Sequence, residues 1–316
     1  MAKPFPRARL LLNPSAGRGR TANFAEKLQS QLGPMAGSIE VFFSKSAEDL
    51  KQLAAKSRRD CVDLLIVAGG DGTVHHAARG ILEEPLGTVP TLAILPLGSA
   101  NDLAYALGLS DGWWQKPGWK VAAIDHGWIQ LNQNPPVAFV NGVGLGLNAM
   151  VTIRSRGIHC LRGIPLYTAA LLQSLLWDWR NRVWKVLVDG QPIPEVEDSR
   201  GLLALSVLNG RREGNFDLCP GARLDDGQFV VMAVRPMSRF RALGLLPSLI
   251  TGSFGNGKGP ILMLDGTQIV VESPEDIPCH ADGELVSVPG DGINKLIIRL
   301  VSKGLPVVVG PGFSSS

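Results

Sequence analysis

Short apolar runs separated by polar loops and helical segments characterise the first 125 residues of the chain. Each run has the length of a buried β-strand, and apolar residues recur at helical spacing between the runs, as Phe24, Leu28 and Leu32 do. The apolar runs are residues 9–12, 39–43, 64–68 and 91–95. Strand, loop and helix in repeated order predict an α/β domain with an open, mostly parallel sheet.

Loops rich in glycine, serine or asparagine follow three of these four strands. They are residues 13–20, 69–73 and 96–102. Because ligands of open α/β sheets bind outside the carboxyl ends of the strands, we expect these loops to lie at one edge and form a ligand site. Glycine that merely ends a strand is the alternative, and it explains three coinciding loops less well.

Strand-like runs replace the helical pattern beyond Asp125. The runs are residues 137–140, 183–188, 202–208, 229–234, 268–272 and 295–301. Asp-Gly pairs between them are typical of tight turns. We predict a second, mainly antiparallel domain, a β-sandwich or partly closed barrel, with two inserted helices near residues 166–180 and 239–249. The predicted domains are residues 1–125, with segment 304–316 as a candidate return to it, and residues 126–303.

Composition and charge narrow the classes of protein that fit. The 316 residues are 45% hydrophobic and 19% charged, which is typical of a globular protein. A net charge of +3 without a nucleic-acid-binding signature argues against a nucleic-acid partner. The four cysteines form no Cys-x-x-Cys pair, so we expect reduced thiols in the cytoplasm and no structural zinc. No apolar run approaches the ~18 residues of a membrane span.

The turn Gly69-Gly70-Asp71-Gly72-Thr73, between a predicted buried strand and a helix, carries the clearest chemistry. Such a turn points backbone N–H groups outward and suits a phosphate. It is not a Walker loop, because no Gly-Lys-Ser/Thr follows, and His75 stands where a dinucleotide fingerprint has its third glycine. A carboxylate beside bound phosphate needs a cation, so Asp71 indicates a kinase-like site with Mg²⁺.

Six short motifs occur in an order that spans nearly the whole chain. They are Asn13-Pro14-x-x-Gly17, Gly69–Thr73, Pro96–Asp102, Leu208–Gly210, Pro220–Gly227 and Asp282–Glu284. Together they resemble the diacylglycerol-kinase catalytic family, and within it the bacterial soluble lipid kinases of the YegS and DgkB type. Gly-Gly-Asp-Gly alone also occurs in NAD kinases and phosphofructokinases, whereas the whole set is specific.

The resemblance implies a lipid kinase with ATP and Mg²⁺. Such an enzyme transfers the γ-phosphate of ATP to a hydroxyl of diacylglycerol or a related lipid in a cleft between two domains. It would be cytoplasmic, in peripheral contact with the inner face of the membrane, and a homodimer is left open. Two alternatives remain: a nucleotide- or lipid-binding regulator without turnover, and an NAD-kinase-like enzyme, which would not explain residues 97–102.

The family's nucleotide-binding positions can be carried over to this sequence one by one. The expected ATP-binding residues are Asn13, Arg18, Ser44, Gly69, Gly70, Asp71, Gly72, Thr73, Val74, His75, His76, Gly98, Ser99, Asn101 and Asp102. Ser44 and Ser99 stand where the family often has Thr, and Arg18 where it often has Lys, so hydroxyl and charge are kept. His75-His76 replaces the usual Asn-Glu and is the main support for a silent regulator.

Carboxylates supply the expected catalytic residues. Asp282 and Glu284 are the candidate general bases that would accept the proton of the lipid hydroxyl. The resemblance assigns Asp71 and Asp125 to the support of the catalytic Mg²⁺, directly or through water. From the residues alone, Asp282 would be an ordinary hairpin-turn residue and Asp125 a turn residue at the junction of the two domains.

The resemblance also implies a structural Mg²⁺ in the second domain. Its ligands would be the carboxylate of Asp226 and the backbone oxygens near Arg223 and Gln228. One carboxylate with carbonyl oxygens is reasonable chemistry for a hard cation. Without the resemblance, Asp226-Gly227 is another turn.

The lipid-binding end of the protein has a weaker signature. Apolar residues form a helical stripe, and three tryptophans lie close to arginines in the sequence. The stripe is Leu171, Leu172, Leu175, Leu176 and Trp179, and the aromatic and basic residues are Trp177, Trp179, Trp184, Arg180 and Arg182. A membrane interface and an ordinary core helix explain this pattern equally well. Residues 239–251 present the same two alternatives, and either segment could line an acyl-chain channel.

Overall fold

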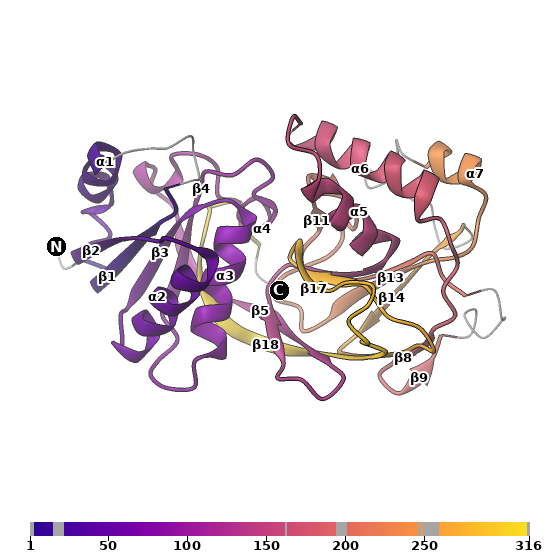
Figure 1. Ribbon diagram of the computed structural model, residues 1–316. Coiled ribbons are helices and arrows are strands. Elements are labelled where there is room, and N and C mark those ends of the chain that lie inside the picture. The colour runs from indigo at the N-terminus through magenta and orange to yellow at the C-terminus, as the bar shows by residue number, and fades with distance from the viewer. Residues whose placement is uncertain are drawn as a thin grey trace. The chain divides into compact units, whose positions relative to one another are not determined.

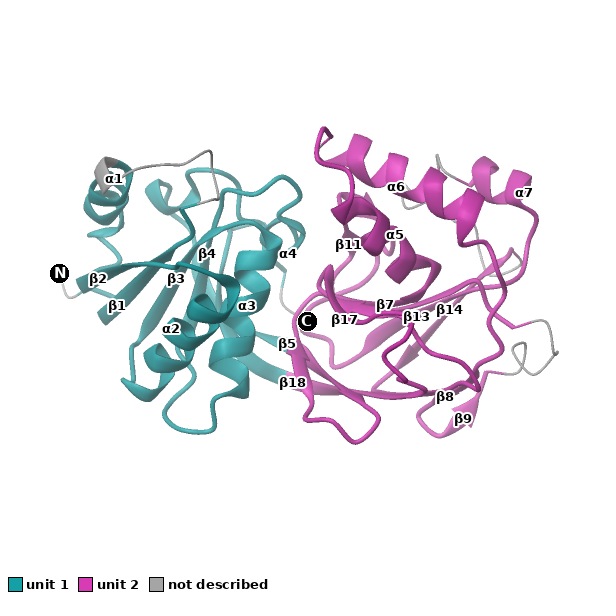
Figure 2. Ribbon diagram, viewed as in Figure 1, with its two compact units in different colours: residues 1–125, 303–316 teal, residues 126–302 magenta. Residues whose placement is uncertain are grey.

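The computed structural model describes residues 3–14, 22–161, 163–193, 201–245, 248 and 259–314, with the side chains of residues 22 and 23 excepted (Figure 1). The chain divides into two compact units. Unit 1 comprises Met1–Asp125 and Lys303–Ser316, and unit 2 comprises His126–Ser302 (Figure 2). The chain passes from unit 1 to unit 2 within strand β5 (Lys120–Leu131) and returns within strand β18 (Lys295–Val309).

Unit 1 is built on a parallel sheet, as the alternating pattern predicts. Its strands are β1 (Phe5–Leu12), β2 (Ala36–Phe43), β3 (Leu64–Gly69) and β4 (Thr91–Pro96), in the order β2-β1-β3-β4. All neighbouring pairs are parallel. The end of β18 extends the sheet beside β4, where Val307 pairs with Leu92 in parallel. The prediction of an open, mostly parallel α/β sheet is therefore confirmed.

The helices of unit 1 follow the strands in the predicted alternation. They are α1 (Ala22–Leu32), α2 (Ala47–Arg59), α3 (Asp71–Glu83) and α4 (Asp102–Ala106), with a short 3₁₀ turn at Trp113–Gln115. Helix α2 begins at Ser46, whose hydroxyl accepts the backbone N–H of Asp49 at 3.1 Å. It packs against α3 at Gly80, where a Cβ would lie 2.3 Å from the carbonyl oxygen of Lys51.

Besides a short two-stranded pair (Arg212–Glu213 and Phe216–Asp217), unit 2 contains two mainly antiparallel sheets around one core. One has the order β14-β13-β10-β7-β16-β17, and the other joins β18, β15, β8 and β9, with β5 beside β18 and β6 beside β5. The bounds are β6 (Val137–Phe139), β7 (Gly142–Gly146), β8 (Lys185–Val188), β9 (Gln191–Pro192), β10 (Ala204–Leu208), β13 (Phe229–Val234), β14 (Ile261–Gly266), β15 (Gln268–Glu272), β16 (Cys279–Ala281) and β17 (Glu284–Ser287). Phe139, Leu205, Phe229, Ile269 and Ile298 come from both sheets and share the buried core, which confirms the β-sandwich.

Helices lie on one side of the six-stranded sheet (Figure 1). The two predicted helices are present as α6 (Ile164–Trp177) and the shorter α7 (Arg239–Gly244). A third helix, α5 (Leu147–Arg156), was not predicted, because its sequence mixes apolar, polar and β-branched residues without a clear apolar stripe. Within the described parts of the chain, no helix combines the length and the hydropathy that a membrane crossing needs.

Candidate functional site

Three loops meet at the carboxyl ends of β1, β3 and β4 in unit 1. The backbone N–H of Asn13 donates to the carbonyl of Ala68 at 3.4 Å, and that of Leu97 donates to the carbonyl of Gly69 at 2.9 Å. The side-chain amide of Asn13 also donates to the hydroxyl of Thr73 at 3.1 Å. These contacts place the loop after β1, the Gly-Gly-Asp-Gly turn and the loop after β4 side by side.

Glycines allow the second and third loops to touch backbone to backbone. A Cβ added to Gly98 would lie 2.3 Å from the Cα of Gly70, and one added to Gly70 would lie 3.0 Å from the Cα of Gly98. A Cβ on Gly69 would collide with the side chain of Thr73. Any larger residue at these positions would push the loops apart, so the close approach explains why these loops contain glycine.

Hydrogen bonds of the Asp71 carboxylate connect the same two loops. Its Oδ2 accepts the backbone N–H of Asn101 at 2.8 Å, and its Oδ1 accepts that of Asp102 at 2.7 Å, at the start of α4. Asn101 has φ 53° and exchanges two side-chain hydrogen bonds with the backbone of Gly98, both at 2.9 Å. The Asp71 carboxylate therefore orders the loop that carries Ser99, which is itself exposed.

The start of α3 gives this cluster the character of an anion site. Gly70 is the N-cap, it makes no side-chain capping bond, and the helix continues for 13 residues. The first N–H groups of such a helix have no partner within the helix, and its dipole favours negative charge there. A phosphate group is the ligand that this edge of the sheet suits best.

The remaining expected ATP-binding residues occupy different environments. The Ser44 hydroxyl is buried at the end of β2 and donates to the carbonyl of Leu12 at 3.3 Å. Val74 and His75 are buried in α3, and the His75 ring meets the half-buried ring of His76 edge-to-face, with centroids 5.2 Å apart. Arg18 lies outside the described residues.

Asp125 is completely buried, with an exposed fraction of 0%. Its Oδ1 accepts the backbone N–H of Lys303 at 2.7 Å, where Lys303 takes the left-handed φ of 52°. The carboxylate thus anchors the chain where it re-enters unit 1. Burial favours this anchoring role, and the expected water-mediated support of a metal stays a prediction.

In unit 2, Asp282 occupies the predicted turn between β16 and β17. Asp282 and Gly283 have φ values of 51° and 81°, as a tight hairpin turn requires. The Asp282 carboxylate accepts the backbone N–H groups of Val140, Asn141 and Gly142 at 3.0, 2.7 and 3.0 Å. Three N–H donors hold this carboxylate in a fixed orientation.

Glu284, the other candidate base, is held by an ion pair. Its Oε2 lies 2.7 Å from Nη2 of Arg156, at the end of α5, and both side chains are partly exposed. A partly exposed ion pair is a weak restraint on a side chain, whereas three backbone N–H groups hold Asp282. The two candidate bases therefore differ in how they are held.

His280 is a site residue that the sequence analysis missed. It is 1% exposed, its Nε2 lies 2.8 Å from Oε1 of Glu213, and its Nδ1 accepts the backbone N–H of Gly283 at 3.3 Å. Its position two residues before Asp282 was the one signal in the sequence, and a strand position alone does not reveal a buried polar contact.

The loop expected to hold a structural Mg²⁺ is an exposed turn. The backbone N–H of Gln228 donates to Oδ1 of Asp226 at 3.1 Å, and the neighbouring Asp225 is buried, 3.8 Å from Nε of Arg223. In the described residues no group of three or more His, Cys, Asp or Glu side chains is arranged to hold a metal. A cation here would depend on one carboxylate and backbone oxygens, a donor set that suits Mg²⁺.

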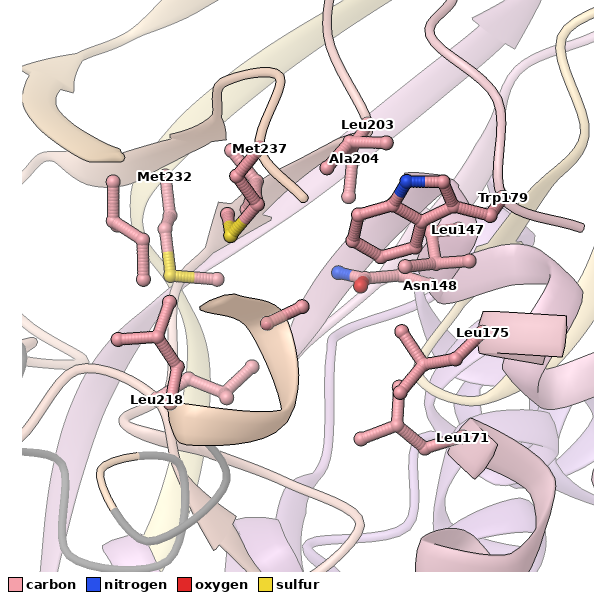
Figure 3. Close-up of a pocket in the computed structure, with 14 residues that line it drawn as sticks. Leu147, Asn148, Leu171, Leu175, Trp179, Leu203, Ala204, Leu218, Met232 and Met237 are labelled. Carbon is pink, nitrogen blue, oxygen red and sulfur yellow. The ribbon is translucent and has the colours of Figure 1, made fainter. Parts of the chain in front are cut away.

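An apolar pocket lies in unit 2 between the helices and the six-stranded sheet (Figure 3). Side chains of α5 and α6 and Trp179 form one side, and two methionines and Leu218 lie opposite. The labelled lining residues are Leu147, Asn148, Leu171, Leu175, Trp179, Leu203, Ala204, Leu218, Met232 and Met237. Asn148 is the polar side chain among them, and its amide donates to the hydroxyl of Ser206.

The surfaces of α6 and α7 carry exposed apolar side chains. Trp177 is 65% exposed and Phe240 87% exposed, with Leu172, Leu176 and Leu243 also exposed. Arg154 lies over the Trp177 ring at 5.5 Å and pairs with Asp178 through two hydrogen bonds of 2.9 and 3.0 Å. Two other residues of the predicted aromatic and basic group, Trp184 and Arg182, are buried and do not belong to this exposed surface. Burial lowers the pKa of Arg182 to about 10.

Two families of known proteins match the chain. The diacylglycerol kinase catalytic domain matches residues 7–130, and the YegS C-terminal NAD kinase beta sandwich-like domain matches residues 141–295. The chain therefore carries a diacylglycerol kinase catalytic domain followed by a YegS C-terminal domain, and the resemblance of its motifs is confirmed.

Individual relatives agree with this assignment. A diacylglycerol kinase of Staphylococcus saprophyticus is 25% identical over 299 residues, which cover 91% of this chain and 92% of that protein. The crystal structure of a diacylglycerol kinase from Bacillus anthracis covers 99% of this chain and 100% of its own, with a TM-score of 0.71 and 20% identity. Yeast NADH kinase in complex with NADH shares the fold at a TM-score of 0.50 and 12% identity, covering 98% of this chain and 84% of its own.

Proposed function

We propose that this protein is a lipid kinase that transfers the γ-phosphate of ATP to a hydroxyl of diacylglycerol or a related lipid. The diacylglycerol kinase catalytic domain supports the general activity. The observation that carries the proposal is the close contact of Gly70 with Gly98 at the start of α3, where Asp71 binds the loop of Gly98 through hydrogen bonds to Asn101 and Asp102. Such a junction suits the phosphates of a nucleotide.

Unit 1 would be the nucleotide-binding domain. The N–H groups at the start of α3 would bind phosphate oxygens, and Asn13 and Thr73 would fix the neighbouring loop through their hydrogen bond. Asp71 accepts the backbone N–H groups of Asn101 and Asp102, and a carboxylate at this edge of the sheet is a ligand that suits a Mg²⁺ ion, directly or through water. Bound Mg²⁺ would neutralise charge on the transferred phosphoryl group.

Unit 2 would bind the acceptor lipid and would provide the general base. The lipid hydroxyl oxygen would form a bond to the γ-phosphorus while the bond to the bridging oxygen breaks, so that ADP leaves with the electron pair. The hydroxyl proton would pass to Asp282 or Glu284. Asp282 has the fixed orientation that a reacting group needs, and Glu284 is held by a partly exposed ion pair; variants of each decide between them.

The apolar pocket of unit 2 supports a lipid rather than a soluble acceptor. Leu171, Leu175 and Met232 offer a surface that an acyl chain would cover and that a sugar or nucleotide would not. The exposed Trp177 and Phe240 would enter the head-group region of the membrane, with arginines facing anionic lipids. The protein would thus act in the cytoplasm, in peripheral contact with the inner face of the membrane, and a homodimer stays a prediction.

The structural Mg²⁺ remains part of the proposal. The Asp226 carboxylate, with backbone oxygens near Arg223 and Gln228, would hold it. Its effect would be to order the exposed turn before β13, remote in sequence from the carboxylates that handle the proton.

Incubation with ATP, Mg²⁺ and a panel of lipids in vesicles tests the proposal, because a lipid kinase yields a phosphorylated lipid. Formation of NADP from NAD would favour an NAD-kinase-like enzyme. ATP binding by folded protein without phosphorylated lipid or NADP would favour a regulator.

A further inference from the structure

The buried His280 and the partly buried Glu213 lie next to the turn that carries the proposed base. His280 belongs to β16, and Glu213 belongs to the short strand β11 (Arg212–Glu213), which pairs with β12 (Phe216–Asp217). The two side chains meet at 2.8 Å between Nε2 and Oε1. A buried imidazole is costly unless its nitrogens have polar neighbours, and here the neighbours are Glu213 and the backbone of the turn.

One hydrogen bond connects the His280 ring to the turn. Its Nδ1 accepts the backbone N–H of Gly283, which leaves the ring proton on Nε2, and Nε2 lies 2.8 Å from Oε1 of Glu213 in a close contact without hydrogen-bond geometry. The ring therefore links a carboxylate on β11 to the backbone of the residue directly after Asp282. A carboxylate that orients an imidazole, which in turn orients a further group, is a common arrangement around reacting residues.

The same short strand reaches the turn by a second route. The carbonyl of Arg212 accepts the side-chain amide of Asn141 at 2.7 Å, and the backbone N–H of Asn141 donates to the Asp282 carboxylate at 2.7 Å. Arg212 and Glu213, which are adjacent in β11, thus each reach the turn through another residue. Arg212 does so through Asn141, and Glu213 through His280. The arrangement controls both the carboxylate of Asp282 and the backbone that follows it.

We infer that Glu213 and His280 are positioning residues that hold the Asp282–Glu284 turn in the orientation needed for proton transfer. The inference rests on the proposed function, because it takes Asp282 or Glu284 as the group that receives the proton. Neither Glu213 nor His280 touches the substrate in this role; Glu213 acts through His280, and His280 acts through the N–H of Gly283.

Variants of Glu213 and His280 test the contact between the two side chains and the contact between His280 and Gly283 separately. Glu213→Ala removes the carboxylate, whereas Glu213→Gln keeps a polar oxygen beside Nε2. His280→Asn places an amide near the position of Nδ1 and can still accept from Gly283, whereas His280→Gln reaches the position of Nε2 and cannot. Glu272→Gln, which removes a carboxylate paired with Lys295 at the surface of unit 2, is the matched control.

Amide hydrogen exchange and steady-state kinetics are measured together on these proteins. We expect Glu213→Ala and His280→Gln to accelerate exchange at Gly283 selectively and to lower kcat by about tenfold to a hundredfold, with the KM for ATP unchanged, because a small displacement of a reacting group is costly. Glu213→Gln and His280→Asn should recover most of the kcat. Glu272→Gln should behave as the wild type.

Two results would overturn the inference. One is an unchanged Gly283 exchange rate in folded Glu213→Ala, and the other is an equal acceleration at Gly283 and in the core strand β13, which would mark a purely structural role. A wild-type protein that phosphorylates no lipid would refute the proposed function instead. The exchange rate of the Gly283 amide would then be the sole test of the positioning role. Selective acceleration at Gly283 would support the role, and any other pattern would refute it.

Discussion

The backbone N–H of Asn141 donates a hydrogen bond of 2.7 Å to Oδ1 of Asp282, and the N–H groups of Val140 and Gly142 complete the cradle. Asp282→Asn replaces one acceptor oxygen with an amide that cannot accept, so the buried N–H of Val140 loses its 3.0 Å contact and keeps at most the longer one of 3.3 Å to the other oxygen. We expect the free energy of unfolding to fall by about 1–3 kcal/mol in urea denaturation and phosphoryl transfer to be lost if Asp282 is the base.

Glu284→Gln is the comparison for Asp282→Asn. It removes one half of a partly exposed ion pair with Arg156, so stability should change by less than about 1 kcal/mol. Loss of activity in this variant alone would identify Glu284 as the base. An Asp282→Asn protein with wild-type stability would contradict our description of the turn.

The turn shows which part of the site the sequence could predict. The Asp282-Gly283 pair predicts a hairpin turn, because both residues tolerate positive φ, and the structure confirms the turn. The residues that hold the carboxylate, 140–142, are far away in the sequence and contribute only backbone N–H groups. Backbone donors leave no signature in residue type, so this cradle could not be predicted.

The same limit applies to the fold. Continuous apolar runs such as β3 and β4 were predicted closely, since burial on both faces gives an uninterrupted pattern. Strand β7 alternates glycine with apolar residues, and glycine lowers strand propensity, so this central strand was missed. Asp71 was predicted as a site residue, but its hydrogen bonds to Asn101 and Asp102 depend on a contact between loops.

Gly98→Ala tests the close approach of the two glycine loops. The added Cβ would lie 2.3 Å from the Cα of Gly70, which is backbone and cannot rotate away. We expect weaker ATP binding by isothermal titration and a loss of about 1–3 kcal/mol of stability from the overpacked contact. Gly312→Ala, where a Cβ meets nothing within 4 Å, is the matched control in unit 1. Equal ATP affinity in both variants would show that the junction does not bind the nucleotide.

Leu171→Trp tests the apolar pocket. Leu171 lines the pocket, whereas its neighbour Leu172 is exposed and is not among the lining residues. A tryptophan at 171 should reduce activity on long-chain diacylglycerol more than on short-chain diacylglycerol and leave the KM for ATP unchanged. Leu172→Trp should leave this chain-length preference as in the wild type. The same loss for every chain length in Leu171→Trp would argue against an acyl chain in the pocket.

Asp60 makes a defined contribution to the acid stability of unit 1. Hydrogen bonds from Lys56 and Arg9 lower its pKa to about 2, below the ~3.9 of an unfolded chain. The unfolded state therefore binds more protons in this range, and stability is lost as the pH falls from about 4 to about 2. Asp60→Asn should lose less of its free energy of unfolding than the wild type over that interval. If the free energy of unfolding fell equally with pH in the wild type and in Asp60→Asn, this role would be contradicted.

The most direct test of the central claim is a phosphoryl-transfer assay with vesicles. Folded wild-type protein is incubated with radiolabelled ATP, Mg²⁺ and vesicles that contain diacylglycerol, and labelled lipid is measured beside that formed by Asp71→Ala and by Asp111→Ala. Asp111 is an exposed turn residue of unit 1 and serves as the control. The account predicts labelled phosphatidic acid from the wild type and Asp111→Ala, and little from Asp71→Ala. Wild-type protein that binds ATP but labels no lipid in a panel of hydroxyl-bearing lipids, or full activity in Asp71→Ala, would contradict it.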